Sequence, residues 1–89
     1  MLKVYNTNRF EKDLKKVMKR KKDFKKLLGV TQYLKQGKRL PERCKDHALQ
    51  GKYVGRRECH IEPDWLLVYK IVDNIVWLER TGTHSDLFN

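Results

Sequence analysis

The last third of the chain contains three β-rich segments that are separated by two short turn sequences. The segments are residues 53–60, 65–71 and 75–81, and the connections are Glu62-Pro63-Asp64 and Asp73-Asn74. Branched and aromatic side chains favour strands, whereas Pro, Asn and Asp favour turns. Because connections this short join antiparallel neighbours, the pattern predicts an antiparallel meander with the segment that begins at Trp65 in its centre.

The first half of the chain has a helical pattern after a short opening strand. Apolar and polar residues alternate over residues 1–5, which predicts a strand at an edge of the sheet. Asn8 and Glu11 have the spacing of a capping box, so a first helix is expected to begin there. Asp23 is expected to cap a second helix, and Gly37 to end it.

Each predicted helix carries one apolar stripe that needs a surface to pack against. The stripe of the first helix consists of Phe10, Leu14, Val17 and Met18. That of the second consists of Phe24, Leu27, Leu28, Thr31 and Leu34. We therefore expect an α+β fold of order β-α-α-β-β-β over a single domain, residues 1–89. Two helices would cover one face of a mainly antiparallel four-stranded sheet and leave the other face free for a site.

The positive charge is concentrated in the N-terminal half. The formal net charge is +10. Residues 1–45 carry 16 basic and four acidic residues, whereas residues 46–89 carry five and seven. This charge predicts attraction to polyanions such as RNA, DNA or the ribosome, and an acidic protein is an equally compatible partner. No apolar segment approaches the roughly 20 residues of a membrane span, and the start does not resemble a signal peptide, so we expect a cytoplasmic protein.

The histidines lie only in the C-terminal half and each stands near a charged residue. They are His47, His60 and His84, with Asp64 and Arg80 close to the last two in sequence. Histidine is suited to proton transfer near neutral pH. Cleavage of RNA without a metal needs a base for the 2′-hydroxyl, an acid for the leaving 5′-oxygen and a cation for the phosphorane. These residues therefore favour a phosphodiester as substrate.

Other interpretations of the same residues stay open at this point. A zinc site is disfavoured because Cys59 and His60 are neighbours in a predicted strand and point to opposite faces; both cysteines are expected as reduced thiols. His47 alone fits an ordinary surface residue, Arg80 fits an ion pair with a nearby carboxylate, and Trp65 fits a core position. A non-catalytic nucleic-acid-binding protein and a protein-interaction module therefore remain alternatives to a nuclease.

Three motifs in the second half resemble those of the RelE superfamily of bacterial toxins, in particular its YafQ-like branch. The motifs are Asp46–Gly51, His60–Lys70, and Glu79–His84 with Leu87-Phe88 after it, and together they cover nearly all of residues 45–88. The resemblance implies two helices on a curved antiparallel sheet. It also implies an mRNA interferase that cuts the message in the ribosomal A site through 2′-hydroxyl attack, with no metal and no organic cofactor.

The resemblance also implies roles for individual residues. The catalytic positions fall on His47, His60, Asp64, Arg80 and His84. We expect His84 to be the general acid and Asp64 or His60 the general base. Arg80 would hold the scissile phosphate and His47 would orient groups or stabilise charge. The residues expected to bind substrate are Trp65, Phe88, Arg56 and Lys52.

Partners follow from the resemblance in the same way. A toxin of a type II pair implies a cognate acidic antitoxin that covers the basic face in a hetero-oligomer. The basic helices would dock on 16S ribosomal RNA, and the lysines expected to do so are Lys15, Lys16, Lys19 and Lys22. A ParE-like toxin that acts on DNA gyrase shares the fold, but that function does not call for the histidine, aspartate and arginine set. A toxin that has lost its activity is a further alternative.

Overall fold

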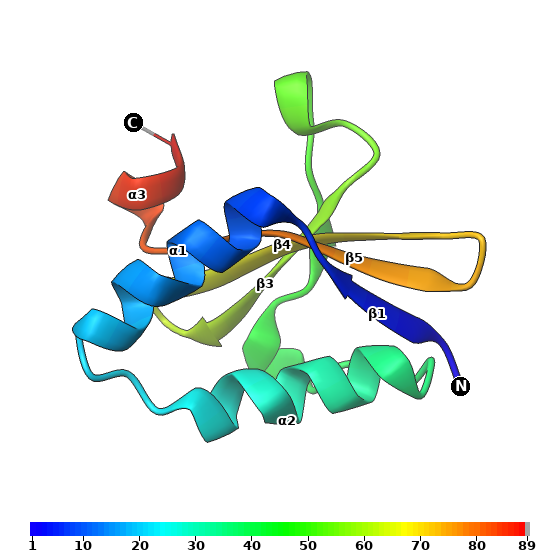
Figure 1. Cartoon of the computed structure of the whole chain (residues 1–89). Coiled ribbons are helices and arrows are strands. Elements are labelled where there is room, and N and C mark those ends of the chain that lie inside the picture. Colours follow the sequence, from blue (N-terminus) through cyan, green and yellow to red (C-terminus); the bar gives the residue numbers. More distant parts are fainter. Residues whose placement is uncertain (89) are drawn as a thin grey trace.

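A computed structural model describes residues 1–88 and shows a five-stranded sheet with helices on it (Figure 1). The sheet order is β1-β5-β4-β3-β2. The strands are β1 (Lys3–Asn6), β2 (His47–Ala48), β3 (Arg57–Glu62), β4 (Trp65–Val72) and β5 (Ile75–Gly82). The helices are α1 (Asn8–Lys19), α2 (Phe24–Lys35) and α3 (His84–Phe88), and single 3₁₀ turns lie at Glu42–Cys44 and Gly51–Tyr53.

The predicted meander is confirmed, with β4 in its centre, but its first strand begins at Arg57 and not at Tyr53, because Gly51–Tyr53 form a 3₁₀ turn. Strand β4 pairs antiparallel with β3 on one side and with β5 on the other. The β4–β5 turn consists of Asp73 and Asn74, both with positive φ (52° and 63°), as a tight hairpin requires. The opening strand β1 lies at the edge, as predicted, and pairs parallel to β5.

The predicted count of four strands is wrong by one, and the helix count also differs. His47 and Ala48 form β2 by pairing antiparallel with Glu58 and Arg57 of β3. The sequence did not predict β2, because two residues are too few to show an alternating pattern. The short helix α3 follows β5 and was not predicted. Both unpredicted elements carry histidines.

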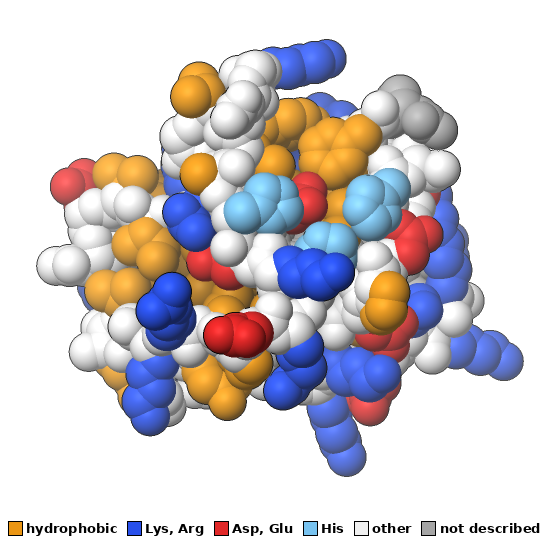
Figure 2. All heavy atoms as spheres, turned by 180° about the vertical axis from the view of Figure 1, so that it is seen from behind, with side chains coloured by type: hydrophobic (Ala, Val, Ile, Leu, Met, Phe, Trp, Pro, Cys, Tyr) orange, Lys and Arg blue, Asp and Glu red, His pale blue; other side chains and the backbone are white. Residues whose placement is uncertain are grey.

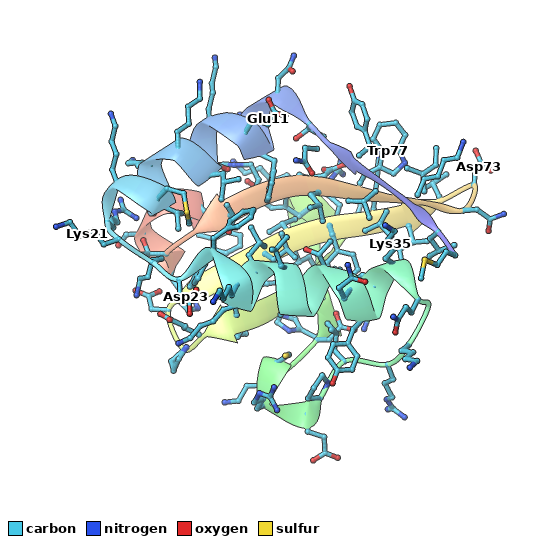
Figure 3. The ribbon with its side chains drawn as sticks, turned by 60° about the horizontal axis from the view of Figure 1, so that its bottom comes forward. Glu11, Lys21, Asp23, Lys35, Asp73 and Trp77 are labelled. Atoms are coloured by element: carbon cyan, nitrogen blue, oxygen red, sulfur yellow. The ribbon has the colours of Figure 1, made fainter. Side chains whose placement is uncertain are left out.

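The helix ends follow local side-chain capping. Thr7, and not Asn8 as predicted, is the N-cap of α1, because its hydroxyl accepts a hydrogen bond from the N–H of Phe10 at 3.1 Å. Asp23 caps α2 as predicted and accepts from the N–H of Lys25 at 3.0 Å; its place at the start of the helix is visible in Figure 3. Gly37, with a φ of +67°, lies just beyond the end of α2.

Both long helices pack on one face of the sheet, as predicted. Phe10 and Val17 of α1 join Leu27 and Leu34 of α2 in the main core. The predicted stripe of α2 is partly wrong. Phe24 and Leu28 are 42% and 46% exposed, and Val30 is buried in their place. Leu27, Val30 and Leu34 are spaced so that they share one side of the helix, which is the side that faces the sheet.

The opposite face of the sheet is only partly covered. Leu66 and Val68 of β4 form a small second core with Leu87 of α3, and Leu49 and Tyr53 pack against it. This cover leaves the neighbouring part of the face open, and the histidines lie there. Within residues 1–88, no helix has the length and hydrophobicity of a membrane-spanning segment.

Candidate active site

The three histidines gather on one face of the molecule, where Figure 2 shows them close together. Their common neighbour is Glu58 of β3, which is only 5% exposed. Its Oε1 lies 3.6 Å from Nε2 of His47 and 3.7 Å from Nε2 of His60. The rings of His60 and His84 are 5.7 Å apart between centroids. Three residues that are distant in sequence therefore form one cluster around a buried carboxylate.

Backbone carbonyl groups fix which nitrogen of two histidines carries a proton. His47 Nδ1 lies 2.8 Å from the carbonyl oxygen of Lys45, and His60 Nδ1 lies 3.1 Å from that of Pro63. A carbonyl oxygen only accepts hydrogen bonds, so Nδ1 is the donor in both rings. The Nε2 atoms are then the positions that gain or lose a proton, and both face Glu58.

Asp46 anchors the segment that carries His47. Its carboxylate accepts a hydrogen bond from Tyr69 Oη at 2.5 Å and one from Arg57 Nη2 at 3.1 Å. Tyr69 is buried in the central strand, so this contact ties the connection before β2 to the sheet. The pairing of His47 with Glu58 then completes the placement of the ring.

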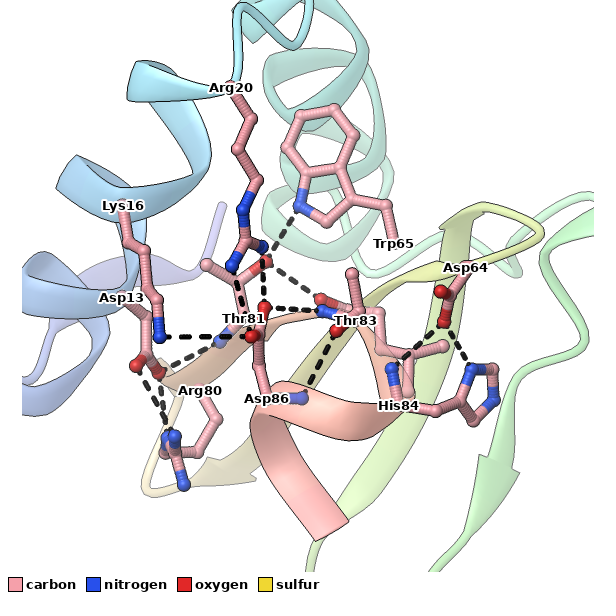
Figure 4. A network of polar contacts seen from close by, with 11 residues as sticks. Asp13, Lys16, Arg20, Asp64, Trp65, Arg80, Thr81, Thr83, His84 and Asp86 are labelled. Atoms are coloured by element: carbon pink, nitrogen blue, oxygen red, sulfur yellow. Dashed lines mark hydrogen bonds and ion pairs between the residues drawn. The ribbon is translucent and has the colours of Figure 1, made fainter. Parts of the chain in front are cut away.

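Asp64 holds His84 through two hydrogen bonds (Figure 4). The Oδ1 atom accepts from the backbone N–H of His84 at 2.9 Å and from its ring Nδ1 at 2.5 Å. These contacts hold the pKa of the Asp64 carboxyl below its usual range. Because Nδ1 donates to the carboxylate, Nε2 of His84 is the ring atom left to exchange a proton with a substrate.

A capping box orients α3, which carries His84. Asp86 accepts from the N–H of Thr83 at 2.9 Å, and Thr83 Oγ1 accepts from the N–H of Asp86 at 3.0 Å. Arg20 of α1 donates to both carboxylate oxygens of Asp86, at 2.6 and 3.1 Å. Gly82, with a φ of +151°, lets the carboxylate approach, since a Cβ there would lie 2.7 Å from Asp86 Oδ2. These contacts fix α3 against α1.

Arg80 is held by a carboxylate from α1. Its Nε donates to Asp13 Oδ2 at 2.6 Å and its Nη2 to Oδ1 at 3.3 Å, and Oδ2 also accepts from the N–H of Thr81 at 3.2 Å (Figure 4). The hydrogen bond to Asp13 raises the pKa of Arg80. Asp13 therefore fixes the orientation of the guanidinium and leaves it fully charged.

The sheet register brings Arg80 to the histidine face. Val68 of β4 pairs with Glu58 on one side and with Arg80 on the other. Directly opposed residues of antiparallel strands share a face, so these three side chains form one row across the sheet. Two strand spacings separate the ends of this row, which is about 10 Å. Arg80 therefore shares its face of the sheet with Glu58, and Leu87 packs over Val68 between them.

The aromatic residues of the predicted site differ in their exposure. Trp65 is 1% exposed and its Nε1 donates to Thr81 Oγ1 at 2.9 Å, so it is a core residue that cannot contact substrate. The prediction that Trp65 binds substrate is therefore wrong, because its side chain is buried in the core. Phe88 is 44% exposed and lies edge-on to Tyr53, with ring centroids 5.6 Å apart. Phe88 and Tyr53 thus form the aromatic part of this face.

The basic residues that were predicted to bind substrate or the ribosome differ in their exposure and in their ion pairs. Lys52 is exposed, and Arg56 is half-buried beside Glu79, to which it donates a hydrogen bond. Lys15, Lys16 and Lys19 are exposed on α1. Lys22 instead bonds Glu62 at 2.7 Å and is less available to a partner.

One group of side chains in the described part of the chain has the composition of a metal site. Ligand atoms of Glu58, His60 and His84 lie within 4.8 Å of one another. Imidazole and carboxylate groups suit ions such as zinc or copper. Cys59 points into the opposite core, as predicted, and has no part in this group.

Sequence reasoning missed three residues that support the site. Glu58 is two residues before His60 in a strand, so alternation places both side chains on one face, a signal that was not used. Asp86 follows Thr83 with capping-box spacing, a signal that predicts the short helix when it is used. Asp13 offered no signal, because a carboxylate on a lysine-rich helix surface does not reveal its partner 67 residues away.

Comparisons with known proteins agree with this geometry. Residues 2–89 match the family model described as bacterial toxin of type II toxin-antitoxin system, YafQ. The mRNA interferase toxin YafQ of Escherichia coli K12 is 45% identical over 83 residues, which are 92% of this chain and 90% of that protein.

Solved structures share the whole fold. The toxin chain in the crystal structure of the E. coli DinJ–YafQ complex is 41% identical, with a TM-score of 0.90 over 100% of both chains. The crystal structure of a metal-bound toxin from Helicobacter pylori is 42% identical, with a TM-score of 0.93 over 99% of this chain and 100% of that one.

Proposed function

Because this chain belongs to the YafQ family of bacterial toxins of type II toxin–antitoxin systems, we propose that it is an mRNA interferase, an endoribonuclease that stops translation. The observation that carries the proposal is the face on which three histidines with defined Nδ1 donors lie opposite a fixed arginine. These are the groups that cleavage of RNA by its own 2′-hydroxyl needs.

His60 and His84 are the proposed proton-transfer pair. Nε2 of neutral His60 takes the proton of the 2′-hydroxyl while that oxygen attacks phosphorus. Nε2 of protonated His84 gives a proton to the 5′-oxygen as the P–O bond breaks. The products are a 2′,3′-cyclic phosphate and a 5′-hydroxyl end. Asp64 was one of two candidates for the base, but it already accepts two hydrogen bonds from His84, which supports a role in orienting that ring.

Arg80 and the remaining groups act through charge and position. The Arg80 guanidinium stabilises the phosphorane oxygens, and Asp13 keeps it in place. Glu58 stabilises the imidazolium that forms at His60. The ring of His47 lies beside the same carboxylate. None of these steps passes through a metal ion.

The ribosome is the proposed setting of the reaction. The exposed lysines of α1 suit contact with ribosomal RNA, and positioning of the message in the A site would supply much of the rate. A toxin that works on ribosomes acts in the cytoplasm. The related E. coli toxin is seen in a complex with DinJ, and we expect this chain to have a cognate acidic antitoxin that covers its basic surface.

Cleavage of programmed ribosomes tests the proposal. Ribosomes that carry a defined message are mixed with wild-type protein or with His84→Ala, and new RNA ends are mapped. Cuts within the A-site codon that only the wild type makes are the expected result. If both proteins bind ribosomes equally and neither cuts, the nuclease assignment is wrong and the chain is a binding protein or an inactive toxin.

A further inference from the structure

A basic groove lies next to the histidine face. It has a volume of about 340 Å³ and runs between the start of α1, strand β5 and the connection before β3. Figure 1 shows that connection projecting beside the first turn of α1. The side chains that matter here are Arg9, Lys52, Tyr53, Arg56, Glu79 and Arg80.

The charge of this groove is only partly neutralised. Glu79 binds Arg56 and also lies 3.4 Å from Lys70, and Asp13 binds Arg80. Arg9 and Lys52 are both exposed, and neither forms an ion pair within the described residues. Arg9 and Lys52 are therefore available to bind an anion. Arg56 and Arg80, which line the same groove, are held in place by their carboxylate partners.

The groove continues directly from the site described above. Arg80 belongs to both, since it lines the groove and shares a cross-strand row with Glu58. Tyr53 lines the groove as well and contacts Phe88 edge-on. Phe88 is four residues after His84 in α3, so the two side chains lie on the same side of that helix. An aromatic surface therefore connects the histidines to the basic groove.

Alternating aromatic and cationic groups suit single-stranded RNA. Bases stack on exposed rings, and Lys and Arg contact the phosphates. We propose that this groove is a phosphate subsite that holds the message beside the scissile linkage, with Arg9 and Lys52 as its phosphate contacts and Tyr53 and Phe88 as its base platform. The inference rests on the proposed function, because it extends the path of the same RNA strand.

The experiment compares two variants with the same change in charge. Arg9→Glu/Lys52→Glu reverses the two unpaired cations of the groove. Lys38→Glu/Arg39→Glu reverses two exposed cations after α2 that do not line it. Both are assayed on programmed ribosomes at subsaturating toxin, and thermal unfolding checks that each is folded. The groove variant should cut on the order of 10-fold more slowly than wild type, whereas the control variant should cut at nearly the wild-type rate.

Neutral linkages in the message separate contact with mRNA from contact with ribosomal RNA. A methylphosphonate, which lacks the phosphate charge, replaces one linkage at a time on either side of the cut. At a linkage that the groove holds, the substitution should slow the wild type but have little further effect on Arg9→Glu/Lys52→Glu.

Three results would overturn the inference. In the first, the groove variant cuts like wild type. In the second, the control variant is slowed equally. In the third, the variant and methylphosphonate effects multiply at every linkage tested, which would place the cations on ribosomal RNA. A wild-type protein that cuts no message would instead refute the proposed function.

Discussion

The carboxylate of Asp64 binds both the backbone N–H and the ring Nδ1 of His84, at 2.9 and 2.5 Å. One side chain thus fixes the start of α3 and the orientation of the imidazole that it carries. Asp64 lies in the β3–β4 turn, whereas His84 follows β5, so the contact joins the first turn of the meander to the segment that leaves its last strand.

This relationship predicts the effect of Asp64→Asn. The Asn side chain keeps an oxygen that accepts from the backbone N–H of His84. It lacks the negative charge of the carboxylate that holds the His84 ring. We expect the single-turnover cleavage rate on programmed ribosomes to fall roughly 10²-fold, because proton transfer from His84 is impaired. Ribosome binding should not change. A variant that cuts at the wild-type rate would show that Asp64 has no part in positioning His84.

Asp13 gives a second prediction, for a residue that touches no substrate. Asp13→Ala leaves the half-buried Arg80 without its partner, and the free energy of unfolding should fall by about 1–3 kcal/mol. Asp13→Asn keeps an acceptor for the N–H of Thr81 and should lose less stability. Both variants should lower the cleavage rate constant more than the affinity for ribosomes. Chemical denaturation and single-turnover assays measure the two effects, and equal losses of rate and affinity would argue against positioning.

Asp86 links stability to pH. Hydrogen bonds from Arg20 hold the pKa of the Asp86 carboxyl well below its usual range. A carboxyl with a depressed folded-state pKa stabilises the protein above its unfolded pKa of about 3.9, and this stability is lost as the pH falls toward the folded value. Asp86→Asn should therefore be less stable than wild type at pH 7.

The difference between the two proteins should shrink in acid. Denaturant unfolding at pH 7 and at pH 3 measures it. A gap that stays constant between these pH values would mean that the charge of Asp86 is not what fastens α3.

The lysines of α1 give a prediction about docking. Lys16 lies 3.8 Å from Asp86, so its reversal would also disturb α3, and Lys22 is bound to Glu62. Lys15 and Lys19 are the suitable positions because they are exposed and four residues apart on one side of α1. Lys15→Glu/Lys19→Glu should weaken binding to ribosomes and reduce its salt dependence, with the unfolding midpoint little changed. Binding like that of wild type would place the ribosome contact elsewhere.

The sequence was sufficient for the parts of the fold that repeat a pattern. Alternation predicted the three strands of the meander, and Asp23 predicted the start of α2. It was insufficient for β2 and α3, which are too short to show a period. Trp65 was assigned to substrate by the family resemblance, with a core position as the alternative, and β4 proves to be covered on both faces. Trp65 through Tyr69 are all buried, so alternation could not show which side each residue faces.

Site residues that stand in a short local motif could be predicted from the sequence. Site contacts between elements that are distant in sequence could not. The histidines, Asp64 and Arg80 stand in short motifs that a comparison of sequences detects. The pairing of Asp13 with Arg80 depends on how α1 packs against the sheet, and the central place of Glu58 depends on how β2 pairs with β3. No local pattern encodes those contacts.

A message with a single 2′-deoxynucleotide at the mapped cut site tests whether the 2′-hydroxyl is the attacking group. It removes the attacking hydroxyl and leaves the protein, the ribosome and the remaining RNA unchanged. We expect wild-type protein to cut the all-ribose message to give a 2′,3′-cyclic phosphate and a 5′-hydroxyl, and not to cut the deoxy message at that position. Cleavage of the deoxy linkage at a similar rate would contradict attack by the 2′-hydroxyl and the roles given to His60 and His84.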